Sequence, residues 1–250
     1  MTVRIFSFGG GRQSHAVMVM QKRGTVHYDE FVFCNVGDDS ENPGTLRYIE
    51  QVTKPYCEMN GIKLTVLDGK RTLYQFMTGD IKTIPIPVYM ASGAPGRRQC
   101  TTLFKRMRIA KYIKKQGGGV VGLGISLDEY QRMRTDSGIA WVKNEYPLID
   151  ARMTLADCRK LIADEGLPEP EKSSCYFCPF HTVTGWRRLR DEHPDLFDTA
   201  VGIERRLNEK RASLGKDNVY LTRFLRPLDQ VIGEQDGLFE QPCDSGYCMV

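Results

Sequence analysis

The residues with the clearest chemical potential are three consecutive glycines near the start of the chain. Gly9, Gly10 and Gly11 follow the apolar run Val3–Phe8, and the helix-compatible run 15–20 comes after residues 9–14. A strand that turns through glycines into a helix presents backbone N–H groups at the positive end of the helix dipole, where phosphate binds well. The pattern predicts a phosphate-binding loop, with a plain tight connection as the alternative.

The eight cysteines form a second candidate group for chemistry. Cys34, Cys57 and Cys158 lie in apolar or helical surroundings, which is typical of buried packing residues. The other five lie in loop-like surroundings, and they are Cys100, Cys175, Cys178, Cys243 and Cys248. The Cys-x-x-Cys pair with a distant third cysteine suits an iron–sulfur cluster or a zinc site, and free thiols are the third interpretation.

The elements that must position these residues alternate between strand and helix. The strands expected from apolar runs are 3–8, 30–35, 63–67 and 120–125. The helices expected from periodicity and end signals are 45–59, 102–116, 154–165, 186–192 and 196–211. This alternation predicts an α/β fold with a doubly wound parallel sheet. We expect a nucleotide-binding domain over residues 1–150 and a helical, cysteine-containing extension over residues 151–250.

Composition narrows the class of protein. The chain has 250 residues, 41% of them hydrophobic, and a net charge of +4. The sequence has neither an apolar run long enough to span a bilayer nor a signal peptide, so we expect a cytoplasmic protein with no membrane partner. Basic clusters such as Lys105–Arg108 and Arg187–Arg190 suit a polyanion, although solvated helix faces would have the same composition.

Four polar segments are expected at strand ends, and they are 9–14, 37–43, Cys100-Thr101 with Lys105, and 124–132. In a doubly wound sheet such segments converge on one cleft at the carboxyl ends of the strands. The sequence therefore predicts one composite site at this edge of the sheet.

In these segments the chain resembles the PP-loop ATP pyrophosphatases, whose fold is adenine nucleotide alpha hydrolase-like, and within them the phosphoadenosine phosphosulfate (PAPS) reductase branch. Residues 7–14 are similar to the Ser-Gly-Gly-x-Asp-Ser loop, with Gly9 and Gln13 in place of its first Ser and its Asp. Residues 36–43 (VGDDSENP), 100–105 (CTTLFK) and 124–132 (GISLDEYQR) resemble three further motifs, in the family's order. The variants are most similar to the DndC/SspD-type subunits of DNA phosphorothioation systems.

The resemblance implies an ATP site with Mg²⁺. The implied binding residues are Ser7, Gly9, Gly10, Gly11, Arg12, Gln13, Ser14, Asn35, Gly37, Asp38 and Gly124. Asp38 and Asp39 would position magnesium or ribose, or only cap their loop. The implied catalytic residues are Lys105, Asp128, Glu129 and Arg132, which would surround the α-phosphate and stabilise its developing charge.

The resemblance also implies a [4Fe–4S] cluster, which relatives bind through a Cys-Cys pair and a later Cys-x-x-Cys. Here the pair reads Cys100-Thr101, so the implied ligands are Cys100, Cys175, Cys178 and Cys248. Cys243 is the alternative fourth ligand, and a three-cysteine cluster with an open iron is another. Zinc, with His181 as a ligand, is the alternative metal.

The function expected from these features is an ATP pyrophosphatase that adenylates a nucleic acid for sulfur insertion. The substrate would be DNA rather than tRNA, and the partner a cysteine desulfurase or another sulfur donor. A sulfonucleotide reductase is the alternative enzyme, although the Glu-Cys-Gly tail of the reductases is absent from the sequence. A nucleic-acid-binding subunit without catalysis is the third interpretation, and Gln13 in place of Asp is its best support.

Overall fold

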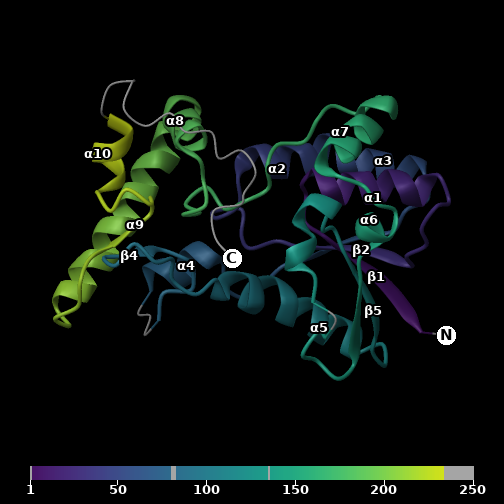
Figure 1. The fold of residues 1–250 in the computed structure, drawn as a ribbon, viewed down its shortest axis with the longest axis horizontal. Coiled ribbons are helices and arrows are strands. Elements are labelled where there is room, and N and C mark those ends of the chain that lie inside the picture. Colours follow the sequence, from purple (N-terminus) through teal and green to yellow (C-terminus); the bar gives the residue numbers. More distant parts are fainter. Residues whose placement is uncertain (1, 80–82, 135, 234–250) are drawn as a thin grey trace. The chain divides into compact units, whose positions relative to one another are not determined.

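The computed structural model describes residues 2–79, 83–134 and 136–233, which form two compact units (Figure 1). Unit 1 consists of Met1–Lys70 and Thr101–Ser174, and unit 2 of Arg71–Cys100 and Cys175–Val250. The domain boundary expected near residue 150 stays a prediction, because compactness does not establish which segments fold independently.

A parallel sheet forms the centre of unit 1, with the strand order β3-β2-β1-β5-β6. Its strands are β1 (Val3–Phe8), β2 (Glu30–Cys34), β3 (Leu64–Leu67), β5 (Gly119–Leu123) and β6 (Val142–Glu145). The chain builds outward from β1 to β3 and then continues on the other side of β1 at β5. This order confirms the predicted α/β sheet. The sequence does not predict β6, because Val-Lys-Asn-Glu is too polar to resemble a buried strand, and it lies at the sheet edge.

Helices cover both faces of this sheet, as the alternation of side chains requires. Phe6 and Phe8 of β1 pack into one core cluster with residues of α1, whereas Ile5 packs with Ile109 and Ile113 of α5 on the other face. Figure 1 shows α1 and α7 running together, with α5 placed apart from them across the strands. Because apolar side chains alternate along β1, both faces are buried and the sheet is doubly wound.

The predicted helices of unit 1 are present, and two contain a π-helical segment. The helical elements are α1 (Arg12–Lys22), α2 (Pro43–Tyr48), η1 (Ile49–Thr53), α3 (Lys54–Met59), η2 (Thr101–Arg106), α5 (Met107–Lys114), η3 (Leu127–Arg132), α6 (Pro147–Asp150) and α7 (Leu155–Asp164). The helix expected at 45–59 is the continuous run α2-η1-α3, and the one expected at 102–116 is η2 followed by α5.

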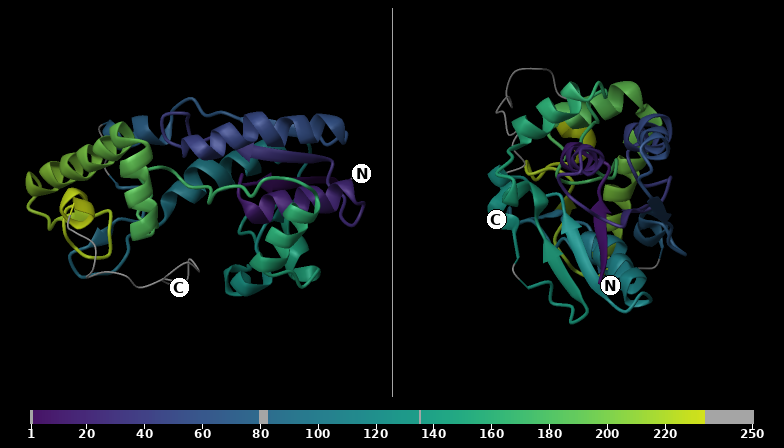
Figure 2. Two further views of the ribbon diagram at one scale, coloured as in Figure 1. Left: turned by 90° about the horizontal axis from the view of Figure 1, so that it is seen from above. Right: turned by 90° about the vertical axis from the view of Figure 1, so that its right-hand side faces the viewer.

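Unit 2 is mainly helical, and Figure 2 shows its longest helix, α9, beside α10. Its elements are α4 (Leu73–Thr78), β4 (Tyr89–Met90), α8 (Val183–Glu192), α9 (Pro194–Ala212), β7 (Val219–Tyr220) and α10 (Leu228–Gly233). β4 and β7 pair antiparallel. The buried carboxylate of Glu204 accepts hydrogen bonds from the backbone N–H groups of Leu221 and Leu228 at 2.6 and 2.7 Å, and so holds the chain after α9 against that helix.

Three cysteines confirm the packing role expected for them. Cys34, Cys57 and Cys158 are buried. Burial raises the pKa of the Cys34 thiol to about 11 and those of Cys57 and Cys158 to about 12, so these groups stay protonated at neutral pH. Among the residues that the structure describes, no helix is long and apolar enough to cross a membrane.

Candidate functional site

Residues 9–11, which we call the glycine loop, lie at the carboxyl edge of the sheet. They are next to the turn that follows β5. Phe8 pairs with Phe33 of β2, and Ser7 pairs with Leu123 of β5. Gly9 and Gly124 therefore leave the sheet side by side. Since the chain continues from β1 and β5 toward opposite sides of the sheet, this edge is the topological switch point, where doubly wound proteins bind ligands.

The conformation of the loop requires glycine at its centre. Gly10 has φ +76°, and a Cβ there would lie 2.9 Å from Cγ2 of Thr45. Gly11 is the N-cap of α1 and carries no side-chain cap. The Ser14 hydroxyl accepts a hydrogen bond from the Gly9 N–H at 2.9 Å and so closes the loop. The first turn of α1 contains no acidic residue, which leaves its positive end available to an anion.

His15 supports the loop from the buried side of α1. Its Nδ1 lies 3.0 Å from the Gly11 carbonyl and its Nε2 lies 2.8 Å from the Thr53 hydroxyl. A carbonyl only accepts, so Nδ1 carries the proton and Nε2 accepts from Thr53. Burial lowers the pKa of His15 to about 4 despite the hydrogen bond to Gly11, so the ring is neutral at pH 7. The sequence pattern gives no sign of this role, because His15 occupies an ordinary helical position.

The turn after β5 contacts the loop through Gln13. Gln13 Nε2 donates to Glu129 Oε2 at 3.4 Å, and Arg132 Nη1 donates to Glu129 Oε1 at 2.6 Å. A Cβ on Gly124 would lie 3.5 Å from Cβ of Gln13. The structure thus brings two predicted catalytic residues and two predicted nucleotide-binding residues together.

The segment after β2 is organised by the side chain of Asn35. Asn35 Oδ1 accepts from the Gly37 N–H at 2.9 Å, and its Nδ2 donates to Asp38 Oδ1 at 2.8 Å. Its backbone carbonyl accepts from Arg108 Nη1 at 2.6 Å. These contacts give Asp38 and Asn35 a loop-forming role in this structure. They also bring Arg108, from the basic cluster Lys105–Arg108, to the same strand end.

Other predicted site residues have structural partners. Asp128 Oδ1 accepts from the Leu155 N–H at 3.1 Å, so it caps the start of α7. Arg12 forms an ion pair with Glu169. The Lys105 backbone carbonyl lies 3.8 Å from the Cys34 thiol, which places Lys105 at the carboxyl end of β2. Ser7 is half-buried within β1.

Several buried oxygen atoms of unit 1 have no hydrogen-bond partner in the described part of the chain. Glu41 is fully buried and both of its carboxylate oxygens are unpartnered. The hydroxyls in the same condition are those of Thr45, Ser126, Ser173 and Ser174. The sequence does not reveal this group. Whether a buried oxygen has a hydrogen-bond partner depends on which distant segments pack together.

The predicted metal ligands that the structure describes all belong to unit 2. Cys100, Cys175 and Cys178 are half-buried, whereas Cys248 and Cys243 lie outside the described residues. His181 Nε2 donates to the Cys175 carbonyl at 2.9 Å, so this nitrogen is not available to zinc. Over residues 2–79, 83–134 and 136–233, no three His, Cys, Asp or Glu residues form a group that could hold a metal ion.

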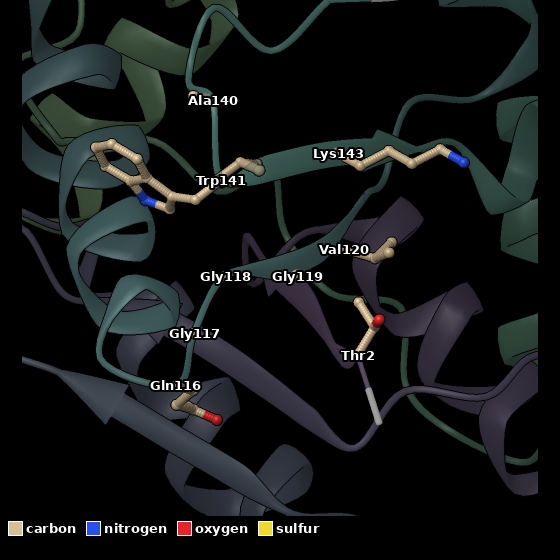
Figure 3. Close-up of a pocket in the computed structure, with 10 residues that line it drawn as sticks. Thr2, Gln116, Gly117, Gly118, Gly119, Val120, Ala140, Trp141 and Lys143 are labelled. Carbon is tan, nitrogen blue, oxygen red and sulfur yellow. The ribbon is translucent and has the colours of Figure 1, made fainter.

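A cavity of about 530 Å³ opens at the opposite edge of the sheet (Figure 3). It is lined by residues at the amino ends of β5 and β6, including Gly118, Trp141 and Lys143. None of the predicted site residues lines it. Because ligands of doubly wound sheets bind at the carboxyl edge, the glycine loop and not this cavity is the candidate functional site.

Comparison with known proteins gives likenesses to a number of solved structures, and two of them are named here. No protein-family model and no curated protein matches the sequence. The chain is similar to the crystal structure of phosphoadenylyl-sulfate (PAPS) reductase from Candida auris in a phosphate complex, with a TM-score of 0.47 and 14% identity over 67% of this chain and 75% of that one. It is also similar to the U34-tRNA thiolase NcsA from Methanococcus maripaludis with its [4Fe-4S] cluster, with a TM-score of 0.46 and 15% identity over 82% of this chain and 71% of that one.

Proposed function

We propose that the chain binds ATP at the glycine loop and cleaves it between the α- and β-phosphates. The observation that carries this proposal is the loop itself, with Gly10 in a conformation that excludes a side chain and α1 beginning at Gly11. The backbone N–H groups of Gly10, Gly11 and Ser14 would bind the pyrophosphate portion of ATP. The sequence resemblance of four motifs to the PP-loop ATP pyrophosphatases supports the same assignment.

The proposed reaction is the adenylation of a substrate oxygen. That oxygen attacks the α-phosphorus of ATP, the bond from this phosphorus to the bridging oxygen breaks, and pyrophosphate leaves. Lys105 and Arg132 would stabilise the negative charge that develops at the α-phosphate, and Glu129 would hold Arg132 in place. Bound Mg²⁺ would supply additional positive charge at the phosphates. A sulfur nucleophile then displaces AMP from the substrate.

We propose a nucleic acid as the acceptor, with DNA phosphorothioation favoured over tRNA thiolation. The preference for DNA rests on the resemblance of the motif variants to phosphorothioation subunits. Basic residues on η2 and α5, among them Lys105, Arg106 and Lys111, would contact nucleic-acid phosphates near the site. A cysteine desulfurase or another persulfide donor would supply the sulfur. Its terminal persulfide sulfur displaces AMP, and a thiol then reduces the S–S bond that still joins the product to the donor, which leaves the sulfur on the substrate.

An iron–sulfur cluster is part of the same proposal, with Cys100, Cys175, Cys178 and Cys248 as ligands. The described cysteines do not by themselves form a metal-binding group, so the ligand set depends on Cys248 or Cys243, outside the described residues. In the alternative with three cysteine ligands, the open iron of the cluster would carry sulfur. None of the steps above is assigned to it.

Product analysis tests the proposal. The protein is incubated anaerobically with ATP, Mg²⁺ and either duplex DNA or tRNA, with a cysteine desulfurase and cysteine as the sulfur source. We expect AMP and pyrophosphate, and phosphorothioate linkages in the digested DNA by mass spectrometry. ADP and orthophosphate as products would contradict the proposal. Thiolated tRNA together with unmodified DNA would show that the substrate is tRNA and not DNA. Sulfite release from PAPS would favour a reductase.

A further inference from the structure

Glu41 is the most unusual charged residue of unit 1. Its side chain is fully buried, and neither carboxylate oxygen has a partner among the residues that the structure describes. Taking a carboxylate out of water without a hydrogen bond or an opposite charge is strongly unfavourable. A buried carboxylate in this condition therefore indicates a missing cation or donor.

Residues close to Glu41 in the chain, and the segment that pairs with them, contact the glycine loop. Thr45, four residues along the chain, lies against Gly10, since Cγ2 of Thr45 would be 2.9 Å from a Cβ there. On the other side of the loop, a Cβ on Gly11 would lie 3.7 Å from Cβ of Ser173. The N–H of Asn42, the neighbour of Glu41, donates to the Ser174 carbonyl at 3.0 Å, so the two flanking segments meet.

The unpartnered atoms on these segments are all oxygens. Thr45, Ser173 and Ser174 each contribute a hydroxyl without a partner in the described part of the chain, and Glu41 contributes the negative charge. A set of oxygen ligands with a single carboxylate suits Mg²⁺, because this ion commonly binds one or two carboxylates, substrate phosphate oxygens and water. The hydroxyls also suit phosphate oxygens, as hydrogen-bond donors.

The other carboxylates of this segment are less suited to that role. Asp38 accepts a hydrogen bond from Asn35, and Asp39 accepts one from Ser40, and both side chains are exposed. Position 13, where the resembled loop has an acid, is an amide that donates to Glu129. A carboxylate for the metal must then come from a neighbouring segment, and Glu41 is the buried one.

We propose that Glu41 is the protein ligand of the Mg²⁺ that accompanies ATP at the glycine loop, in place of Asp38 or Asp39. The inference rests on the proposed ATP binding and adds the residue that holds its metal. Thr45 and Ser173 complete the polar lining around the phosphates.

Calorimetric titration of ATP in Mg²⁺ and in EDTA tests this assignment. We expect the wild-type protein to bind ATP at least about tenfold more tightly in Mg²⁺. Glu41→Gln should lose that gain and bind ATP in EDTA at least as tightly as the wild type, because a negative charge near the phosphates is removed. Without ligand, Glu41→Gln should melt at a higher temperature than the wild type. Glu50→Gln, which alters an exposed carboxylate outside the proposed site, should leave all three values essentially unchanged.

A second measurement does not depend on a variant that folds. Wild-type protein labelled with carbon-13 glutamate is mixed with Mn²⁺ and ATP, and electron–nuclear double resonance is recorded. We expect a hyperfine coupling between Mn²⁺ and the carboxylate carbon of a glutamate that binds it directly. The absence of this coupling overturns the proposal.

The outcomes separate the inference from the function on which it rests. Equal ATP affinity in Mg²⁺ and EDTA, or a Glu41→Gln protein that keeps the metal-dependent gain, overturns the role of Glu41 while ATP binding stands. A wild-type protein that binds ATP in neither condition overturns both.

Discussion

Gln13 Nε2 donates a hydrogen bond to Glu129 Oε2 at 3.4 Å, which joins the first turn of α1 to the segment after β5. The two residues are far apart in the sequence and belong to two of the four segments expected to converge. Glu129 also accepts from Arg132 at 2.6 Å, so the position of this arginine is connected to that of the glycine loop.

Removing the charge of Glu129 should slow chemistry more than binding. Glu129→Gln keeps the side-chain shape but no longer pairs with Arg132 through a full charge. We expect pyrophosphate release to slow by about a hundredfold with a small change in the KM for ATP. The control is Glu50→Gln, which alters an exposed ion pair with Lys54. Equal rates for Glu129→Gln and the control would refute a role for Glu129 in the reaction.

The glycine loop should be intolerant of a side chain at Gly10. Gly10→Ala combines a positive φ with a Cβ 2.9 Å from Thr45, so the loop must shift. We expect it to abolish measurable ATP binding in calorimetry. Gly24→Ala is the matched control, since Gly24 has φ +69° and nothing within 4 Å of an added Cβ. It should cost about 1 kcal/mol of stability and leave ATP affinity unchanged. The same affinity in both variants would rule out close contact between the loop and phosphate.

The buried imidazole of His15 should make stability depend on pH. Its pKa is about 4 in the folded protein and about 6.5 when exposed. Between these values the unfolded chain holds a proton that the folded chain lacks, so the free energy of unfolding rises with pH across this window, by about 3 kcal/mol in total.

Urea unfolding from pH 4 to pH 7 measures this contribution. His15→Gln retains a hydrogen-bonding side chain but does not titrate, so its stability should rise less steeply with pH than that of the wild type. The difference between the two proteins isolates His15 from the other titrating groups. Parallel curves would show that folding does not lower the pKa of His15.

Metal content should distinguish the cysteines proposed as cluster ligands from the buried packing cysteines. Anaerobically purified wild-type protein should contain iron and acid-labile sulfide and absorb broadly at about 400 nm. Cys175→Ser and Cys178→Ser should each lose most of the iron, whereas Cys34→Ala, at a buried packing position, should retain it. Colourless protein with stoichiometric zinc, or with neither metal, contradicts the cluster.

The sequence by itself determined the features that depend on residues close together along the chain. Apolar runs and end signals located β1, β2, β3 and β5, and the alternation of elements indicated a parallel sheet. The glycine run after β1 indicated the loop, because a left-handed backbone at Gly10 is a local requirement. Local context also separated the buried Cys34, Cys57 and Cys158 from the other cysteines.

The tertiary structure alone decided which polar groups have partners. Asp128 caps α7, Arg12 pairs with Glu169, and His15 is buried against Thr53, and none of these partners is near in the sequence. The polar strand β6 exists because β5 offers it an open edge. Glu41 looks like a loop residue in the sequence and is fully buried in the fold. Burial and hydrogen bonding depend on segments brought together by packing, and local patterns do not encode them.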